Sequence, residues 1–350
     1  MADRNTQVAL DRFTSRMLSQ YVSPWEFEQL KQRIQSWDQW CVEWSKAARK
    51  HAEIGDQAVA EGHRLTAGTA YIRAALYYHW ATFLFVHDQQ QWLAGMQAMD
   101  ACWKKAAPLV NPPMELMDIP FEGVMLPGYL RKPGGVAKPP LVFLVPGGDS
   151  TKEELYDFGD YMLERGLAVF AFDGPGQGLV SAKVKLRPDF EVPIRAVTDF
   201  VLQRAAAGVD EKRLAIGGIS YGGIFACRAA AFDRRFKAVF SASSWYTPAN
   251  RFPGMDPLSQ NGLKQYMGDN AQQVQDSITM AGAAYRLEVP LLQVYGGLDK
   301  ASPPEHAYRV EKEVKGPTTT LVFDDGVHVC NNLSHIVRPL IADWLADHLR

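Results

Sequence analysis

The chain has 350 residues, of which 47% are hydrophobic and 22% charged, and its 37 basic and 39 acidic side chains give a net charge of −2. This composition excludes disorder for most of the chain, and the length predicts about two domains. The near-neutral charge argues against a surface that binds nucleic acid. The four cysteines form no C-x-x-C pair, which predicts reduced thiols in the cytoplasm, without disulfides or a metal site.

Residues 1–110 follow the helical period and are expected to form a separate all-helical domain. Ser23 and Pro24 are expected to begin a helix over 23–44. One apolar face of this helix recurs at steps of three and four residues: Phe27, Leu30, Ile34, Trp37 and Cys41. Two further helices are expected over 66–86 and 90–106, and a proline-containing segment over 108–117 ends the block.

The most apolar of these segments, residues 67–86, is expected to be a buried helix and not a membrane span. Arg73 and His79 lie near its middle, where a spanning helix tolerates few charges. Its aromatic residues recur at helical spacing and are expected in the core: Tyr71, Tyr77, Tyr78 and Trp80. The start of the chain has no apolar leader, so no secretory signal is expected. No membrane partner is expected either.

After the prolines the pattern changes to short apolar runs separated by helical patterns. A hairpin is expected over 121–131, with its turn at Pro127-Gly128. Six buried strands are expected over 141–145, 167–172, 213–218, 237–243, 291–296 and 319–323. Alternation of strands with helices predicts an α/β domain over 111–350, in which helices cover a mostly parallel sheet.

A G-x-S-x-G pentapeptide spans residues 218–222, with Ser220 at its centre. The bare pentapeptide is weak evidence, but an expected strand precedes it and a helical pattern follows it. Glycine on both sides suits the tight turn that lifts a serine hydroxyl above a sheet. This context favours Ser220 as a nucleophile over a serine that merely begins a helix.

A nucleophilic serine needs a base, and after such a turn the acid and then the histidine follow in the chain. His328 comes directly after the last expected strand. The other downstream histidines lie in helical patterns: His306, His335 and His348. Asp299 follows the preceding strand and would fix the imidazole tautomer. Asp324 and Asp325 are rival acids, but they lie within four residues of His328 on one loop, where reaching behind its ring is awkward.

An oxyanion formed by attack of Ser220 needs preorganised donors. One expected donor is the backbone N–H of Tyr221. Others are expected from Gly147 and Gly148, in the loop after the strand 141–145. The alternative for this loop is an ordinary glycine turn.

The same loop is expected to lead into a helix. Ser150 and Glu153 have the spacing of a capping box. Lys152 is expected on that helix with its charge in solvent. Asp149, within the loop, is a candidate pocket residue.

Trp245 and Tyr246 follow the strand 237–243 and either line a pocket for an aromatic substrate or pack in the core. Basic residues are few in the segments expected around the site, and Arg251 alone is expected to enter the pocket. An uncharged or weakly charged aromatic or acyl ketone or ester is therefore expected, and not a phosphorylated substrate.

A glycine-rich loop at 174–178 has G-x-G-x-G spacing, whereas a dinucleotide site has G-x-G-x-x-G. We therefore expect no nucleotide cofactor, and an oxidoreductase is disfavoured. The loop is interpreted as a shaped segment at the carboxyl edge of the sheet that borders the pocket.

With these residues assembled, the chain resembles a branch of the α/β-hydrolases that includes the 2,6-dihydroxypseudooxynicotine hydrolases, fungal polyketide-shortening hydrolases and FrsA-like esterases. Four segments carry the resemblance: PGGDSTKEE (146–154), DGPGQG (173–178), GISYGG (218–223) and GVHVCNN (326–332). The run over 67–85 and the LPGYLRKP segment are also similar.

The resemblance implies an N-terminal helical lid and a catalytic triad of Ser220, Asp299 and His328. It also implies cleavage of a C–C bond next to a ketone, or of simple esters. In one position the chain departs from the pattern: Leu179 stands where the family often has glutamate after DGPGQG. This departure puts the specific substrate in question and leaves the triad in place.

The leading hypothesis is a cytoplasmic, homodimeric serine hydrolase that forms an acyl-enzyme with a small-molecule substrate and uses neither metal nor cofactor. Cleavage of a C–C bond in an aromatic or polyketide-like substrate is the first interpretation, and a carboxylesterase is the alternative. A hydrolase homologue that binds a ligand without catalysis is a third hypothesis, disfavoured by the complete set of Ser, Asp, His and glycine loop.

Overall fold

The computed structural model describes residues 2–205 and 208–350, and the chain divides into two units. The helical unit contains the chain up to Leu116 together with Asp256–Gly262. The α/β unit contains Met117–Met255 and Leu263–Arg350. The sequence places the start of the catalytic domain at residue 111.

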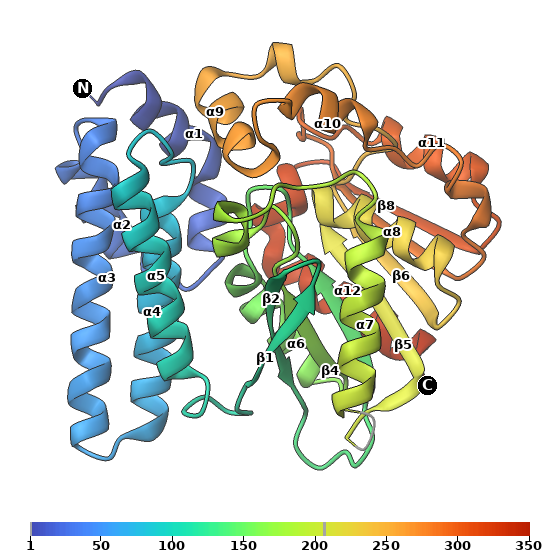
Figure 1. Cartoon of the computed structure of the whole chain (residues 1–350), viewed down its shortest axis with the longest axis horizontal. Coiled ribbons are helices and arrows are strands. Elements are labelled where there is room, and N and C mark those ends of the chain that lie inside the picture. The colour runs from blue at the N-terminus through green and yellow to red at the C-terminus, as the bar shows by residue number, and fades with distance from the viewer. Residues whose placement is uncertain (1, 206–207) are drawn as a thin grey trace. The chain divides into compact units, whose positions relative to one another are not determined.

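Five helices build most of the helical unit: α1 (Arg4–Leu18), α2 (Pro24–Arg33), α3 (Trp37–Ala60), α4 (Arg64–Thr82) and α5 (Gln89–Ala106) (Figure 1). Its core is aromatic. Trp44 packs against Trp40 and Tyr77, with ring centroids 5.9 and 5.4 Å apart, and the Trp40 indole N–H donates to the Trp80 carbonyl. The expected core role of the aromatic residues on α4 is confirmed, since Tyr71, Tyr77, Tyr78 and Trp80 are all buried.

The single helix expected over residues 23–44 is wrong, because α2 ends at Arg33 and α3 begins at Trp37. Ser36 begins the new helix in a capping box with Gln39, and Ile34 has extended backbone. Ile34 is nevertheless fully buried, so the apolar pattern is shared by two helices. Helix α4 also ends before the expected Val86, because Phe83 is extended and Leu84 has a φ of 56°.

Residues 256–262 follow the α/β unit's strand β6 in the chain but are counted with the helical unit. Arg12 of α1 forms an ion pair with Asp256 and a hydrogen bond with the Ser259 hydroxyl. A side chain at Gly262 would meet Leu84 at 2.4 Å. The helical unit is therefore built from two separate stretches of chain.

An eight-stranded sheet forms the centre of the α/β unit, in the order β1-β2-β4-β3-β5-β6-β7-β8. The strands are β1 (Glu115–Phe121), β2 (Val124–Arg131), β3 (Pro140–Val145), β4 (Ala168–Phe172), β5 (Asp210–Ile219), β6 (Phe236–Ala242), β7 (Leu291–Gly296) and β8 (Thr318–Phe323). From β4 to β8 neighbouring strands are parallel, whereas β2 runs antiparallel to β4. The expected mostly parallel sheet is confirmed.

Two expectations about the sheet need correction. The hairpin turn lies at Glu122 and Gly123, whose φ values are 44° and 82°, and not at Pro127-Gly128, which lies inside β2. Gly128 is needed there because a Cβ would meet the Phe170 ring of β4 at 2.4 Å. The second correction concerns β8, which is only partly buried because it is the edge strand of the sheet.

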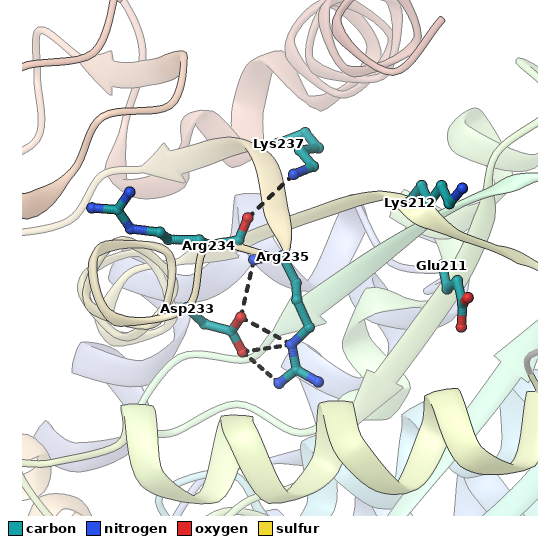
Figure 2. Close-up of a pocket in the computed structure, with 6 residues that line it drawn as sticks. All are labelled: Glu211, Lys212, Asp233, Arg234, Arg235 and Lys237. Carbon is teal, nitrogen blue, oxygen red and sulfur yellow. Dashed lines mark hydrogen bonds and ion pairs between the residues drawn. The ribbon is translucent and has the colours of Figure 1, made fainter.

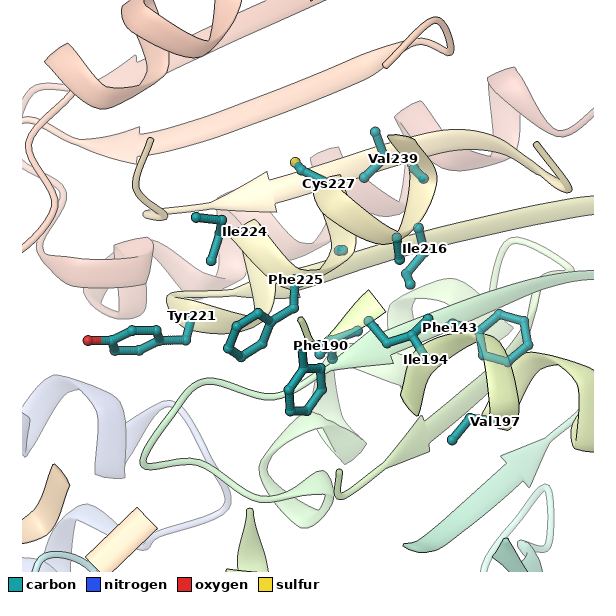
Figure 3. Close-up of a cluster of buried hydrophobic side chains, with 14 of the residues drawn as sticks. Phe143, Phe190, Ile194, Val197, Ile216, Tyr221, Ile224, Phe225, Cys227 and Val239 are labelled. Atoms are coloured by element: carbon teal, nitrogen blue, oxygen red, sulfur yellow. The ribbon is translucent and has the colours of Figure 1, made fainter. Parts of the chain in front are cut away.

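The helices that follow β3 in the chain are α6 (Tyr156–Leu163), α7 (Glu191–Ala205), α8 (Tyr221–Phe232), α9 (Pro257–Met267), α10 (Ala271–Ser277), α11 (Glu305–Glu313) and α12 (Ser334–His348). Among them, α6 packs against α12 and α7 against α8. Phe190, just before α7, stacks on Phe225 of α8 with ring centroids 4.2 Å apart, next to the apolar residues of β3 and β5 (Figure 3). This packing seats α8, and with it the residue just before it, on the middle of the sheet.

Within the described residues, no helix is long and apolar enough to cross a membrane. All four cysteines are free and buried: Cys41, Cys102, Cys227 and Cys330. Burial raises the pKa of the Cys102 thiol to about 11 and those of Cys227 and Cys330 to about 12. Cys330 is therefore a packed thiol and not a nucleophile.

Candidate active site

Ser220 lies on a sharp turn between β5 and α8. Its backbone has φ 56° and ψ −124°, a conformation that a side-chain-bearing residue adopts only when its surroundings enforce it. The N–H of Ser220 donates to the Ala242 carbonyl at 2.8 Å. Glycine is required on both sides, because a Cβ at Gly222 would lie 2.1 Å from the Val145 carbonyl oxygen and one at Gly218 would lie 2.3 Å from Gly222. This is the strand–turn–helix geometry that exposes a nucleophilic serine.

His328 and Asp299 stand in line with that serine. The Ser220 Oγ lies 3.0 Å from His328 Nε2, and His328 Nδ1 lies 2.7 Å from Asp299 Oδ2. The three side chains come from the ends of β5, β7 and β8, whose carboxyl ends meet at one edge of the sheet. We refer to Ser220, His328 and Asp299 as the candidate triad.

Asp299 is held as a charged acceptor. Burial alone would raise its pKa, but the charge and hydrogen bond of His328, together with backbone N–H groups, outweigh burial and lower the pKa below its ordinary value. These N–H groups are those of Ala301 and Ser302, 2.9 and 3.0 Å from Asp299 Oδ1. One carboxylate oxygen is thereby fixed by the backbone while the other faces the imidazole. The rival acids Asp324 and Asp325 make no such contact with His328 among the described residues.

Polar side chains that the sequence analysis did not single out fix the loop that carries His328. Val329 and Cys330 have φ values of 62° and 51°. The Val329 N–H donates to Ser243 Oγ at 2.8 Å, and Asn331 Nδ2 donates to the His328 carbonyl at 3.1 Å. Asn332 binds the backbone of Val327 and Asp325 in the same loop. The paired asparagines after GVHVC were the available signal, because asparagine side chains often bind nearby backbone groups.

Three backbone N–H groups around Ser220 have no hydrogen-bond acceptor within the described residues: those of Gly147, Gly148 and Tyr221. Tyr221 is the first residue of α8, where the N–H groups have no partner within the helix. Gly147 lies beside the nucleophile, since a Cβ there would be 3.3 Å from Ser220 Cβ. A Cβ at Gly148 would meet the Tyr221 ring at 2.8 Å. These are the donors that the sequence predicts for an oxyanion.

The expected position of Lys152 is wrong: its side chain is 5% exposed and lies between Glu153 and Asp173. Lys152 Nζ lies 3.1 Å from Asp173 Oδ2, and the Lys152 N–H donates to Asp173 Oδ1 at 2.7 Å. Burial alone would lower the pKa of this ammonium, but the charges of Asp173 and Glu153 outweigh it and raise the pKa. The expected capping box is also wrong, because Glu153 binds Lys152 and the buried Ser150 hydroxyl has no partner within the described residues. A 3-10 turn over Lys152–Leu155 replaces the expected start of a helix.

Trp245 packs against His328 of the candidate triad and against two neighbouring residues, Tyr221 and Arg251. Its ring centroid lies 5.9 Å from that of His328 and 4.8 Å from that of Tyr221, and the Arg251 guanidinium lies 4.8 Å from the indole centroid. The indole N–H donates to the Ala301 carbonyl, beside the Asp299 turn. Trp245 is thus buried beside His328, with Arg251 on its indole; that either residue lines a pocket stays a prediction.

Tyr246 turns in a different direction. Its hydroxyl donates to Glu313 of α11 at 2.9 Å, and the Arg309 guanidinium lies 3.7 Å from its ring centroid. Asp149 lies close enough to the Tyr221 hydroxyl to act on it electrostatically. Burial raises the pKa of that hydroxyl to about 12, against the opposing charge of Arg251.

A concave region lies at the amino ends of β5 and β6, away from Ser220. This pocket of about 610 Å³ is lined by Glu211, Lys212, Asp233, Arg234, Arg235 and Lys237 (Figure 2). Arg235 is engaged by Asp233 and Asp199 at 2.5 and 2.6 Å. The pocket contains no nucleophile–base pair, so shape alone does not mark the site of chemistry. Within residues 2–205 and 208–350, no group of three His, Cys, Asp or Glu side chains is arranged to hold a metal ion.

The sheet and the arrangement around Ser220 define a serine hydrolase with the α/β-hydrolase fold. A family model described as "Esterase FrsA-like" matches residues 33–246, and a model of the prolyl oligopeptidase family matches residues 156–349. The chain belongs to the FrsA-like esterase family of α/β-hydrolases, so the expected resemblance is confirmed.

Individual relatives agree with this assignment. The α/β hydrolase pydG of Acremonium sp is 38% identical over 222 residues, which cover 60% of this chain and 52% of that protein. The chain thus spans about half the length of this fungal relative. The 2,6-dihydropseudooxynicotine hydrolase of Paenarthrobacter nicotinovorans is 29% identical over 316 residues, covering 89% of this chain and 84% of the relative. The crystal structure of the 2,6-dihydroxy-pseudo-oxynicotine hydrolase superposes with a TM-score of 0.86 at 28% identity, over 96% of this chain and 95% of that one.

Proposed function

We propose that the protein hydrolyses a C–C bond next to a ketone in an aromatic or polyketide-like small molecule, through an acyl-enzyme on Ser220. The observation that carries the proposal is the continuous chain of hydrogen bonds from Ser220 Oγ through His328 to Asp299. The similarity to the 2,6-dihydropseudooxynicotine hydrolase, which extends over most of both chains, supports the substrate class.

In the first half of the reaction, Ser220 Oγ attacks the substrate carbonyl carbon while His328 Nε2 takes the hydroxyl proton. The carbonyl oxygen becomes an oxyanion, which the N–H groups of Tyr221, Gly147 and Gly148 stabilise. When the carbonyl re-forms, the adjacent C–C bond breaks and its electron pair leaves as an enolate. His328 returns the proton to the leaving carbon, which gives a neutral ketone.

In the second half, a water molecule takes the place of the Ser220 hydroxyl as the nucleophile and as the proton donor to His328. His328 takes a proton from the water, the hydroxide attacks the acyl carbon, and the proton is then returned to Ser220 Oγ. The product is a carboxylic acid. Asp299 stabilises the imidazolium in both halves and fixes the tautomer that presents Nε2 to the serine.

The alternative is a carboxylesterase, in which an alkoxide leaves in place of the enolate and the same residues act. The family's description as esterases favours this alternative. The two reactions differ in the leaving atom that must be protonated, carbon in one and oxygen in the other. A homologue that binds a ligand without catalysis is disfavoured by the donor–acceptor alignment of all three side chains.

We expect a flat, neutral or weakly acidic substrate. Trp245 places an aromatic ring 5.9 Å from that of His328, which supports an aromatic substrate at this position. Arg251, beside that indole, offers a single cation, which suits the delocalised charge of an enolate better than a phosphate dianion. Asp149 remains a candidate pocket residue, whereas the contact of the Tyr246 hydroxyl with Glu313 favours the alternative of core packing for Tyr246.

We propose that the helical unit caps the site. Residues 256–262 belong to this unit and directly follow, in the chain, the segment that carries Trp245 and Arg251. This short connection supports the proposal. Deleting residues 1–110 should abolish both solubility and turnover. A soluble 111–350 fragment with an unchanged KM would refute the cap.

We further propose a cytoplasmic homodimer. The four buried free thiols suit a reducing compartment. Light scattering after size-exclusion chromatography measures the oligomeric state, and a mass of one chain would refute the dimer.

The function is tested with a panel of aryl β-diketones, acyl-phenols and p-nitrophenyl esters, with products identified by mass spectrometry. Cleavage of β-diketones to an acid and a ketone is the expected result, whereas turnover of esters alone would favour the carboxylesterase. Competition against ester turnover separates substrate classes: neutral aryl ketones should inhibit at lower concentrations than matched aryl phosphates. Failure of a fluorophosphonate to label Ser220 would favour the non-catalytic homologue.

A further inference from the structure

Gln177 lies in the DGPGQG segment, outside the candidate triad, and its whole side-chain amide is engaged by backbone. Its Oε1 accepts the Gly174 N–H at 2.9 Å. Its Nε2 donates to the Pro146 carbonyl at 2.8 Å and to the Gly147 carbonyl at 3.0 Å. The side chain is fully buried, so these bonds are shielded from water. One residue thus binds two consecutive carbonyls of the loop beside Ser220.

Holding those two carbonyls fixes where the loop's N–H groups point. In a planar trans peptide the C=O and N–H bonds are antiparallel. If the Pro146 and Gly147 carbonyls are directed at Gln177, the N–H groups of Gly147 and Gly148 are directed away from it. Consecutive N–H groups on one side of a backbone form a concave site for an anion. These are the N–H groups that have no acceptor among the described residues.

A second contact between the same two segments adds rigidity. Asp173, at the start of DGPGQG, binds both the backbone N–H and the ammonium of Lys152, at the end of the PGGDSTKEE segment. Asp173, Lys152 and Glu153 are all buried. Two of the four segments that carry the resemblance are therefore held together, by the hydrogen bonds of Gln177 at one place and by the Lys152–Asp173 ion pair at another.

We infer that Gln177 is a positioning residue for the oxyanion site: it orients the Pro146–Gly147 and Gly147–Gly148 peptides so that their N–H groups face the oxyanion formed by attack of Ser220. This inference rests on the proposed function and extends it, because it assigns a role to a side chain that does not touch the substrate. Donors of an oxyanion site act by being fixed before charge develops, so a loss of orientation costs rate and not substrate affinity.

The test compares Gln177→Glu and Gln177→Leu with a matched control, Gln293→Glu. Glutamate keeps the size of the side chain but presents a carboxylate to two carbonyl oxygens, and leucine removes the donors altogether. Gln293 is also buried and donates to two acceptors, the Ala307 carbonyl and Thr320 Oγ1, but it lies within β7. A purely structural role for a buried glutamine would affect all three variants alike.

Three readouts separate positioning from stability. The first is the second-order rate of Ser220 labelling by a fluorophosphonate, which needs no knowledge of the physiological substrate. The second is the affinity for an aryl trifluoromethyl ketone: Ser220 Oγ adds to its carbonyl carbon, the carbonyl electron pair becomes the oxyanion, and His328 takes the proton. The third is the melting temperature of each variant.

Both Gln177 variants should lower the labelling rate and the affinity for the trifluoromethyl ketone by about 100-fold, the size of effect seen when one oxyanion donor is lost. The KM for a turned-over ester should change less than about threefold, because ground-state binding does not use these donors. Gln293→Glu should lower the melting temperature as much as the Gln177 variants do, but it should change the rate of Ser220 labelling little. If both Gln177 variants fail to fold, Gln177→Met, which is flexible and similar in volume, is measured in the same way.

The inference is overturned if a folded Gln177 variant labels within about threefold of the wild-type rate, or if Gln293→Glu slows labelling as much. A different result bears on the proposed function: labelling or turnover that persists in Ser220→Ala means that the serine mechanism itself is wrong. The two failures are therefore distinguishable in one set of variants.

Discussion

Strands β5 and β6 end in two very different ways at the two edges of the sheet. At their carboxyl ends, Ser220 and Ser243 have φ values of 56° and 48°, and both bind backbone far away in the chain. At their amino ends, partly exposed charged side chains form ion pairs, such as Arg235 with Asp233 and Asp199. Chemistry is expected where strained backbone and buried polar groups are held by distant partners, whereas a charged concave surface is screened by water and salt.

The largest expected effect at the carboxyl edge follows from Ser220→Ala. Loss of a triad nucleophile costs about a million-fold in kcat in the serine hydrolase for which it has been measured, and a similar loss is expected here. Single-turnover kinetics and circular dichroism measure the rate and the fold together. Activity close to wild type in a clean preparation of this variant would contradict the expectation that the chemistry takes place at the carboxyl ends of these strands.

A smaller loss is expected from Asp299→Asn. An asparagine amide favours the wrong imidazole tautomer, which costs about ten-thousand-fold in the serine protease where it was measured. Asp324→Asn and Asp325→Asn are the matched controls and should retain near wild-type kcat. If either control is crippled while Asp299→Asn is normal, the acid is wrongly assigned.

The lowered pKa of Asp299 also predicts a pH dependence of stability. Because the folded protein holds this carboxyl ionised more readily than the unfolded chain does, the stabilisation is complete above the ordinary pKa of aspartate and is lost as the pH falls through the folded value. The melting-temperature gap between wild type and Asp299→Asn should therefore narrow between about pH 5 and pH 2. A gap that widens on acidification would contradict the assignment.

Ser243→Ala tests whether the loop that carries His328 depends on its distant partner. The substitution leaves the Val329 N–H without its acceptor, which costs about 1–3 kcal/mol when the group is buried. We expect a loss of about tenfold in kcat, because displacement of the loop moves the imidazole. Thr198→Val, at a buried hydroxyl in α7 that bonds to the Ile194 carbonyl, is the control and should leave kcat unchanged.

The smallest effect is expected at the amino edge. Arg235→Ala removes ion pairs from a partly exposed guanidinium, and such pairs contribute about 1 kcal/mol or less. Urea denaturation should show a change of that size, and kcat should be unaffected. A large loss of turnover would mean that the charged pocket participates in function.

The candidate triad and the buried strands were predictable because their signals are local and ordered along the chain. Ser220, Asp299 and His328 each follow a continuous apolar run, in the order that this fold requires. Lys152 was not predictable in this way. Lysine is almost never fully buried unless it is paired, and its partner Asp173 is separated from it by 21 positions.

The predictions of the hairpin turn and of the single helix over residues 23–44 failed for a different reason. Pro127-Gly128 has the composition of a turn, but its glycine serves the close approach of the Phe170 ring inside a strand. Ile34 continues the apolar period across the gap between α2 and α3, so periodicity alone hides the break that Ser36 introduces. At Gly128 the contact with Phe170 decides for a strand over a turn, and at Ser36 the capping box with Gln39 decides for two helices over one.

The buried thiols described above are divided equally between the two units. Cys41 and Cys102 lie in the helical unit, and Cys227 and Cys330 lie in the α/β unit. A thiol buried with a raised pKa reacts with an alkylating reagent only when its surroundings open. The two buried cysteines of each unit can therefore report on the opening of that unit. Pulsed alkylation followed by peptide mass analysis would measure how often each unit opens, without any introduced label.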